Sequence, residues 1–470
     1  MIAKRVTKSV IFCIVLAFAV NSVYHVLAWK DTAGDYVSSV ESFYDLDDDV
    51  VDVLFLGSSH CYCSINNSIL WNKYGIASFS LAISGQDIVS TYYTLAEAFK
   101  TQNPQVVCVE ISSATTLGYQ VVGNLYRNTL SLKRSANSYE AVRSMVKDDD
   151  PMDYWLKWPI IHTRYAELQR EDFDDDRTAY IGYSAGFVTN PTWDSVSYLQ
   201  AEPVPIAEEN EEYIRKIIEL VQGKGARLCF FVAPYSVDQT AQGMYRYVEG
   251  IADEYDVDFM NLTYSQDGLT LNMGTDFIDS FHTNYYGAEK TTAYMGNYLH
   301  SNYSLPDRRG QEGYELWDED AMARLHEVQN QSFLLQEPDI KSYLYYIRSL
   351  EEYTLFVFTE GDYLAENVTI EDDLQTAGIG EEFYSGRHVW VFENSQLKYS
   401  AGEEAGLYYA DIPRGEYAVS ITEEGISLLV NRAPYKMVAD GINIVVYDNL
   451  LGKVVDSVGF NGQQDYAPVR

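Results

Sequence analysis

Continuous apolar runs alternate with amphipathic stretches through the middle of the chain. The apolar runs are VDVLFLG (51–57), QVVCVEIS (105–112), ARLCFFVAP (226–234) and VDFMNL (257–262). Helical patterns lie between or after them, at 88–100, 210–223, 241–255 and 286–300. Apolar strands that alternate with amphipathic helices are typical of a parallel sheet covered on both faces. The pattern therefore predicts an α/β domain over residues 51–305.

Residues 113–205 break this alternation. They mix aromatic and acidic side chains, as in WLKWPIIHTRYAELQREDF (155–173). Long loops at the carboxyl edge of a parallel sheet commonly build the substrate site. We therefore expect about 113–205 to be an insertion over that edge.

A second pattern begins near the C-terminal third of the chain. Residues 306–337 are charged and are expected to be a helical or linking segment. From 338 a helix precedes strands at 353–358, 388–392 and 415–421, and two further strands meet across 449–452. This predicts a separate, sheet-rich α/β domain over 338–470, without histidine–carboxylate pairs.

The N-terminus combines positive charge with a long apolar segment. Lys4, Arg5 and Lys8 precede Val10–Trp29, which is mostly apolar. About twenty such residues can cross a bilayer, and the flanking charge places the N-terminus inside. No convincing A-x-A site follows, so an uncleaved anchor at 9–29 is favoured over a signal peptide. We expect a cytoplasmic tail at 1–8, a linker at 30–50 and an extracytoplasmic remainder.

The length and composition of the chain limit the number of domains and the classes of molecule that it can bind. A chain of 470 residues is too long for one ordinary core, so two or three domains are expected. The net charge of −36 argues against nucleic acid, because phosphate binding needs a basic surface. Forty tyrosines suit sugar or polymer surfaces as well as half-buried sheets. The aspartate runs at 47–49, 148–150 and 174–176 lack the spacing of a calcium loop, which favours solvated surface.

The five cysteines do not form a disulfide framework. Cys13 lies in the anchor, and Cys108 and Cys229 lie in apolar strands. Cys61 and Cys63 are too close together for an easy bridge, and no second pair completes a zinc site. We interpret the strand cysteines as small buried side chains. Neither a metal nor an organic cofactor is implied.

The first strand ends in a glycine, two serines and a histidine, GSSH (57–60). Ligands of parallel sheets bind outside the carboxyl ends of the strands, which is where Ser58 and Ser59 lie. Backbone N–H groups at a helix N-terminus there can hold an oxyanion. The alternative is that these serines only cap the following helix, because serine is a common cap.

A distant segment, DFIDSFHTNYYGAEK (276–290), favours the catalytic interpretation. Asp279 and His282 are spaced so that the carboxylate can reach the imidazole and fix its tautomer. A strand-end serine, a histidine and an acid are the parts of a nucleophilic triad. In SLAISGQD (80–87), Gly85 precedes a helix, and its N–H is a candidate oxyanion donor or part of a turn.

The segments GSSH, LAISGQ, VVCVEIS and DSFHTNYYG occur in an order that resembles the SGNH/GDSL hydrolase superfamily. The resemblance covers about residues 50–303. Within that superfamily, the chain is most similar to membrane-anchored extracytoplasmic members found beside bacterial systems that modify cell-surface polysaccharides and teichoic acids. It implies a flavodoxin-like three-layer α/β/α sandwich.

The same resemblance implies roles for individual residues. Ser59 is the implied nucleophile, with Ser58 in place of the usual aspartate. The N–H groups of Ser59 and Gly85 are the implied oxyanion donors. Asp279 and His282 complete the implied triad.

One departure from the family pattern concerns the oxyanion site. The third block normally supplies an asparagine in a Gly-x-Asn-Asp setting, whereas here VVCVEIS runs into two serines. The hydroxyl of Ser112 and the amide of Gln86 are candidate substitutes. Loss of one donor typically costs about 10²–10³ in rate. A slow enzyme, an unusual transferase and a non-catalytic relative therefore all stay open.

Other polar residues are weaker candidates. His60 either contacts substrate or caps the following helix, and the cap is slightly favoured. His162 and Arg164 are candidate substrate contacts, or they form the core of the insertion. GYSAG (182–186) matches a nucleophile elbow, but an acidic run precedes it and Pro191 follows too closely for a helix. We interpret that match as chance.

The C-terminal region resembles the ILEI-type domain, a lectin-related module implicated in sugar binding. The matching stretches are 353–362, the L-x-x-A-G-I turn at 374–379, and 441–460. A sugar-binding accessory domain and a packing domain fit equally well.

These patterns predict a serine-dependent esterase or O-acyltransferase acting on acyl groups, acetyl above all, of an extracytoplasmic polysaccharide. The alternative is a non-catalytic glycan-binding or assembly protein of the cell envelope with the same fold. Expected partners are the polysaccharide or teichoic-type polymer, the membrane through the anchor, and a membrane-bound acyltransferase. The expected location is the cell membrane, with a single pass.

Overall fold

The computed structural model of the chain describes residues 2–28, 37–116, 122–168, 170–173, 181–189, 201–347, 350–361, 386–402, 406–461 and 466–470. It divides into two compact units, Met1–Ala321 and Met322–Arg470.

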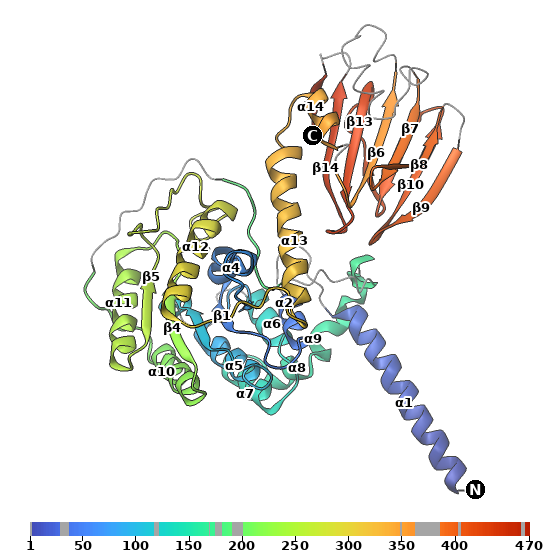
Figure 1. Ribbon diagram of the computed structural model, residues 1–470. Coiled ribbons are helices and arrows are strands. Elements are labelled where there is room, and N and C mark those ends of the chain that lie inside the picture. The colour runs from blue at the N-terminus through green and yellow to red at the C-terminus, as the bar shows by residue number, and fades with distance from the viewer. Residues whose placement is uncertain are drawn as a thin grey trace. The chain divides into compact units, whose positions relative to one another are not determined.

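A five-stranded parallel sheet forms the centre of the first unit (Figure 1). Its strands in spatial order are β2 (Ser78–Ala82), β1 (Val53–Gly57), β3 (Val106–Glu110), β4 (Arg227–Val232) and β5 (Asp258–Asn261). The order 2-1-3-4-5 is that of flavodoxin-like doubly wound sheets. The predicted parallel α/β sheet is therefore present. The short strand β2 adds to the four strands that the apolar runs predicted.

Helices cover both faces of this sheet. One face packs against α2 (Val37–Tyr44), α5 (Ile88–Ala98), α10 (Glu208–Gly223) and α11 (Gln239–Glu254). The other packs against α3 (Ser59–Ser64), α4 (Asn67–Tyr74) and α12 (Tyr285–Asn302). Along β1, Leu54 and Leu56 enter the first core, whereas Val53 and Phe55 enter the second. Strands β1 and β3 are buried throughout and β4 is buried after its first residue, which explains why these strands read as continuous apolar runs, whereas β5 at the sheet edge is only partly buried.

The segment predicted as an insertion contains short helices. They are η1 (Ser112–Thr115), α6 (Val122–Leu130), α7 (Ala136–Met145), α8 (Pro151–Leu156), α9 (Trp158–Ile161), η2 (His162–Ala166) and η3 (Arg170–Phe173). Ala141 and Met145 of α7 join the core that contains α5. Part of the insertion is therefore built into the sheet domain.

Helix α1 (Ile2–Leu27) carries the N-terminal apolar run. Its portion Val6–Leu27 is long and apolar enough to cross a membrane, a test that a signal sequence also passes. Phe12 and Phe18 on this helix are more than half exposed.

The segment that the sequence predicts as a linker, 306–337, contains α13 (Glu315–Gln329) and the π-helical turn η4 (Asn330–Leu334). Trp317 is fully buried, and its indole N–H donates to the carbonyl of Ser78 at 2.8 Å. Arg308 forms a two-pronged ion pair with the buried Asp52, with both distances 2.9 Å. Residues 308–317 therefore pack on the first unit.

The second unit is built from two antiparallel sheets. The six-stranded sheet has the order β15 (Ala467–Val469), β14 (Lys453–Asn461), β13 (Gly441–Asp448), β6 (Tyr353–Glu360), β7 (His388–Glu393) and β8 (Gln396–Ala401). The four-stranded sheet has the order β12 (Ala433–Tyr435), β11 (Gly425–Val430), β10 (Gly415–Thr422) and β9 (Gly406–Ile412). Phe356 and Val419 belong to the core between the sheets.

A second core in this unit packs α14 (Ile340–Ile347) against the six-stranded sheet, with Tyr343 against Phe460. The unit is therefore a β-sandwich with a helix on one outer face, more β-rich than the predicted α/β domain. The L-x-x-A-G-I turn at 374–379 lies outside the described residues. This unit also holds a histidine–aspartate pair, His326 with Asp448 at 3.0 Å, whose histidine lies in the segment predicted as helical or linking and not within 338–470.

Candidate functional site

Strand β1 ends in a turn that requires a glycine. Gly57 has a φ of +146°, and a Cβ there would lie 2.6 Å from the Cβ of Glu110. Ser58 then caps α3, because its hydroxyl accepts a hydrogen bond from the N–H of His60 at 3.3 Å. Ser59 is therefore the first residue of α3, at the carboxyl end of a buried strand.

The loop that carries Asp279 and His282 is fastened to α3. Asp279 Oδ1 accepts from the backbone N–H groups of Phe281 at 2.7 Å and His282 at 2.9 Å. The Thr283 hydroxyl donates to the carbonyl of Cys63, at the end of α3, at 2.8 Å. These contacts hold the histidine next to the start of the same helix.

Ser59, His282 and Asp279 form a continuous hydrogen-bonded chain. His282 Nδ1 lies 3.0 Å from both carboxylate oxygens of Asp279, and His282 Nε2 lies 2.9 Å from Ser59 Oγ. Because the carboxylate accepts from Nδ1–H, Nε2 is free to accept the serine proton. The structure thus joins the three residues that the sequence predicted as a triad.

The carboxylate of Asp279 stays ionised. Partial burial raises its pKa, but the hydrogen bonds from the His282 ring and from the backbone N–H of Phe281 outweigh this effect. The net pKa of Asp279 is therefore below its ordinary value. An ionised carboxylate can stabilise the imidazolium that forms when His282 takes a proton.

Two backbone N–H groups near Ser59 lack an acceptor in the described part of the chain. The N–H of Ile83 donates to the carbonyl of Gly57 at 3.2 Å, which holds the 83–86 turn beside the end of β1. Gly85 in this turn has a φ of +64°, a conformation that favours glycine. In the described part of the chain, neither the Ser59 N–H nor the Gly85 N–H has an acceptor.

Asn124, on α6 of the insertion, lies directly against Gly85. A Cβ on Gly85 would lie 2.1 Å from Asn124 Nδ2, so any larger residue would displace this amide. Asn128 fixes α6 here by donating to the carbonyl of Ser84 at 3.1 Å. The Asn124 Oδ1 accepts from Arg127 at 3.1 Å, whereas its Nδ2 finds no acceptor among the described residues. No sequence motif marks Asn124.

Gln86 and Ser112, the two candidate substitutes for the missing third-block asparagine, form hydrogen bonds with other buried groups. Gln86 is fully buried, where its Oε1 accepts from the N–H of Ile83 and its Nε2 donates to Thr91. The Ser112 hydroxyl donates to the carboxyl of Glu110 at 2.8 Å. Each side chain already satisfies a buried partner, so turning it toward a ligand would leave that partner unpaired.

Glu110 is a buried carboxyl at the end of the central strand β3. It accepts hydrogen bonds from the N–H and hydroxyl of Ser112, from the N–H of Ala233 at 3.4 Å, and from the Ser58 hydroxyl at 3.5 Å. Burial raises its pKa to about 7, although these hydrogen bonds act in the opposite direction. Glu110 therefore braces the turn that carries Ser59. An acid inside an apolar strand was the sequence signal for it.

An aromatic wall, defined here as His60, Tyr235 and Phe281, flanks the triad. The His60 ring meets Tyr235 edge-on, with centroids 4.6 Å apart, and lies 5.4 Å from the His282 ring. Burial and the neighbouring His282 lower the pKa of His60 to about 3, so this ring is neutral. Phe281 is 52% exposed. The wall offers an apolar surface beside the reactive serine.

His162 and Arg164 are not brought to the triad by any described contact. The Arg164 guanidinium donates to the carbonyls of Leu27 and Ala28, both at 2.7 Å, and forms an ion pair with Asp172. The exposed His162 ring contacts the carbonyl of Pro159. Their candidate role as substrate contacts therefore has no support in the geometry, because Arg164 binds the end of α1 instead.

The GYSAG segment is not a nucleophile elbow. Residues 182–186 form extended chain with neither a strand before nor a helix after them in the described residues 181–189. The Ser184 N–H donates to the carbonyl of Tyr62 at 3.0 Å. The interpretation of this match as chance is confirmed.

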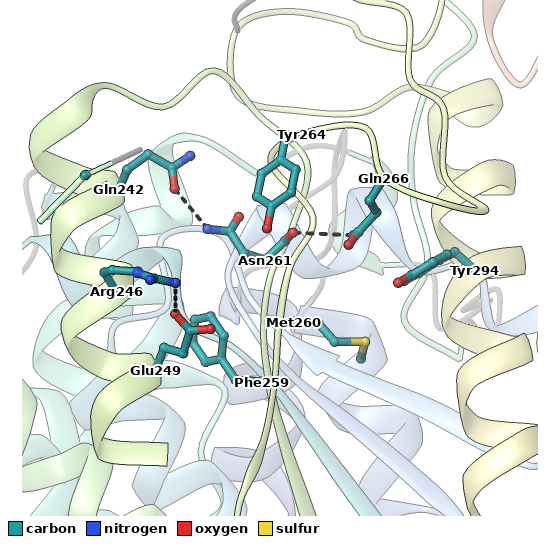
Figure 2. A pocket seen from close by; sticks show the side chains of 10 residues that line it. Gln242, Arg246, Glu249, Phe259, Met260, Asn261, Tyr264, Gln266 and Tyr294 are labelled. Carbon is teal, nitrogen blue, oxygen red and sulfur yellow. Dashed lines mark hydrogen bonds and ion pairs between the residues drawn. The ribbon is translucent and has the colours of Figure 1, made fainter. Parts of the chain in front are cut away.

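A polar pocket lies at the end of β5 (Figure 2). Its lining comes from α11, β5, α12 and the loop after β5, and includes none of the candidate site residues. Asn261 donates to Gln242 at 2.9 Å, and Gln266 donates to the carbonyl of Asn261 at 3.5 Å. These amides mainly satisfy one another, so the pocket gives no indication of chemistry.

Among the described residues, no group of three or more histidine, cysteine, aspartate or glutamate side chains could hold a metal ion. The cysteines at 61, 63, 108 and 229 are buried free thiols. The interpretation of these cysteines as small buried side chains is confirmed.

No family model matches the chain, and no curated protein matches it. Solved structures that resemble it include an acylhydrolase from Bacteroides fragilis, with 7% identity, a TM-score of 0.30, and coverage of 58% of this chain and 99% of that one. A GDSL-like lipase from Bacteroides thetaiotaomicron has 10% identity, a TM-score of 0.30 and coverage of 57% and 100%. A family two carbohydrate esterase from Clostridium thermocellum has 11% identity, a TM-score of 0.25 and coverage of 55% and 66%. Likenesses this remote do not establish an activity.

Proposed function

We propose that this protein is a serine esterase that cleaves acyl esters, with Ser59 as nucleophile, His282 as general base and Asp279 as the residue that orients the imidazole. The observation that carries this proposal is the unbroken chain of contacts, 2.9 Å from Ser59 to His282 and 3.0 Å from His282 to Asp279. A serine that only capped a helix would not need a histidine and a carboxylate aligned on its hydroxyl.

The reaction follows from this geometry. Ser59 Oγ attacks the acyl carbonyl while its proton passes to His282 Nε2, forming a tetrahedral oxyanion. The carbon–oxygen bond to the alcohol then breaks, and the alcohol leaves with the proton from His282. Water, activated by His282, attacks the acyl–serine, and the acid is released with Ser59 regenerated. Asp279 keeps the imidazole in the required tautomer throughout.

The oxyanion has three donors in this proposal. Two are the N–H groups of Ser59 and Gly85, which lack acceptors in the described part of the chain. The third is Nδ2 of Asn124, which packs on Gly85 with no acceptor of its own among the described residues. A helix of the insertion would thus supply the amide that the end of β3 lacks. Preorganised donors of this kind are the largest single contribution in many acyl transfers.

The proposed substrate is an O-acylated, above all O-acetylated, polysaccharide of the cell surface. The aromatic wall supports a sugar substrate, because an aromatic face can pack on the apolar face of a sugar ring. The apolar helix α1 supports a membrane-anchored, extracytoplasmic location. Transfer of the acyl group to a sugar hydroxyl would use the same acyl–serine, with that hydroxyl replacing water.

A fluorophosphonate probe tests the proposal directly, because it reacts covalently only with an activated serine. We expect the wild-type chain to be labelled and Ser59→Ala to be unlabelled. Ser58→Ala is the matched control: it removes the neighbouring hydroxyl, which contacts Glu110, and should retain labelling. An unlabelled wild type would favour the non-catalytic glycan-binding protein, and labelling lost only in Ser58→Ala would identify the wrong nucleophile.

Substrate class is tested next with acetylated and deacetylated forms of the same polysaccharide. Release of acetate from the acetylated form alone would support the esterase. Transfer would show as acetyl groups on an added oligosaccharide, with less free acetate than acyl groups removed.

A further inference from the structure

The insertion forms hydrogen bonds with the C-terminal end of α1. Arg164 on η2 donates to the carbonyls of Leu27 and Ala28, both at 2.7 Å. These are carbonyls that a helix end leaves unsatisfied, and a cation there also complements the helix dipole. Asp172, on η3, forms an ion pair with the same guanidinium at 2.8 Å. The end of α1 therefore does not emerge into free solvent.

Aromatic contacts surround the same helix end. The ring of Tyr24 on α1 lies 6.0 Å from the ring of Trp158 on α9. Both helices are labelled in Figure 1. The Arg134 guanidinium lies 5.8 Å from the Tyr24 ring. Tyrosine, tryptophan and arginine are the residues that favour the boundary between lipid and water.

The length of α1 places this end at the membrane surface if the helix spans the bilayer. The 22 residues from Val6 to Leu27 rise about 33 Å, close to the hydrocarbon thickness of about 30 Å. Tyr24 and Leu27 then lie at the outer boundary of the hydrocarbon. The segments bonded to Leu27 must lie at the same level.

Those segments expose large apolar side chains. Tyr165 on η2 is 72% exposed and Phe173 on η3 is 67% exposed. Met152 and Leu156 on α8 are also exposed. A single exposed apolar residue is ordinary in a folded protein. Four such residues lie within one short stretch that also contacts α1, and a concentration of this kind indicates an interaction surface.

We infer that residues 152–168 and 170–173 form a membrane-apposed collar, in which these four side chains enter the lipid interface around the outer end of α1. The occupant is lipid, because the collar is continuous with the end of an apolar helix of membrane-spanning length. The collar would restrain the sheet domain against the bilayer through a second set of contacts. The inference rests on α1 crossing the bilayer and is independent of the proposed esterase activity.

Site-directed spin labelling of the full chain in phosphatidylcholine nanodiscs tests the collar. The described cysteines other than Cys13 are buried, so Cys13→Ala gives a background in which an introduced cysteine is labelled selectively. Nitroxides at Tyr165→Cys and Phe173→Cys should collide with oxygen several-fold more, relative to a water-soluble nickel chelate, than one at Leu407→Cys. Leu407 is a matched control because it is also well exposed, on β9 of the second unit.

A nitroxide at Leu16→Cys reports whether α1 is inserted. If position 16 is lipid-exposed while 165 and 173 match 407, the collar is wrong although the anchor is right. If position 16 is also water-exposed, both fail. Shielding of 165 and 173 from oxygen and nickel alike would assign this surface to a protein contact and overturn the lipid interpretation.

Discussion

Each unit of this chain contains a histidine paired with an aspartate at 3.0 Å. In the first unit the pair is His282 with Asp279, and in the second it is His326 with Asp448. The two pairs differ in what the other imidazole nitrogen contacts. Nε2 of His282 meets the hydroxyl of Ser59, whereas Nε2 of His326 lies 3.4 Å from the carboxylate of Glu352.

Exposure separates the pairs as well. The side chain of His282 is 27% exposed and that of His326 only 8%. The His326 ring also stacks on Tyr353, with an interplanar angle of 3°. A histidine enclosed by an aspartate, a glutamate and an aromatic ring can hold a fold together but cannot reach a substrate. A histidine–aspartate pair is thus informative about catalysis only together with the nucleophile beside it.

Substituting each of the two histidines with alanine should give the largest difference in activity between the two pairs. His282→Ala should lower kcat for an acyl ester by about 10⁴-fold or more, because the serine loses its base. His326→Ala should leave kcat within about twofold, since no described contact joins it to the first unit's triad. Steady-state kinetics on both variants, with folding checked by circular dichroism, compares them. Equal losses of activity in the two variants would contradict our assignment.

The next expected effect concerns the oxyanion donors that we propose for the first site. Asn124→Ala should lower kcat by about 10²–10³-fold with little change in KM, because the amide would act only on the transition state. The rate of fluorophosphonate labelling should fall with it. Asn137→Ala on α7 is a control, since that amide donates to the carbonyl of Tyr93 instead. An unchanged kcat in Asn124→Ala would remove this residue from the proposed site.

The smallest expected effect is on stability and concerns the second pair. The hydrogen bond that the His326 ring donates to Asp448 raises the pKa of His326, so its contribution to stability is present below the unfolded pKa of about 6.5 and is lost as pH rises through the folded value. Burial raises the pKa of Asp448, but its hydrogen bond with His326 and others hold it below normal. The stability that Asp448 contributes is therefore lost on acidification.

His326→Gln should therefore lower the free energy of unfolding by about 1–2 kcal/mol more at pH 5.5 than at pH 8.5. Urea titrations at the two pH values measure this difference. His162→Gln, at an exposed ring, is the control variant and should change the free energy of unfolding by less than about 0.5 kcal/mol. A loss of equal size at both pH values would mean that His326 stabilises the fold by packing alone.

The features that could be predicted from the sequence are those that depend on one short segment of the chain. Four strands of the parallel sheet followed from apolar runs, because a strand covered by helices on both faces is built mostly from apolar residues. Ser59 and the Asp279–His282 spacing were visible because each belongs to a short local motif. The strand Ser78–Ala82 was missed because its five residues include two serines, both buried in the fold.

What the sequence could not show depends on segments that meet only in the fold. Asn124 reaches Gly85 from a helix of the insertion, where no motif marks it. His326 and Asp448 lie 122 residues apart and pair through the packing of the second unit. Arg164 was a candidate substrate contact because of its charge and position, and its actual partner is the end of a helix near the N-terminus.

The hydrogen bond from Thr283 to the carbonyl of Cys63 has a consequence for how such a site can evolve. Ser59 and His282 lie far apart in sequence, yet this tie sets their spacing through a few residues of α3 and one loop. Surface segments of the long chain between them, outside the strands that brace this turn, can therefore vary without changing that spacing. If the proposed reaction is right, such changes would alter which molecule is accepted, and how fast, while Ser59 and His282 stay in register.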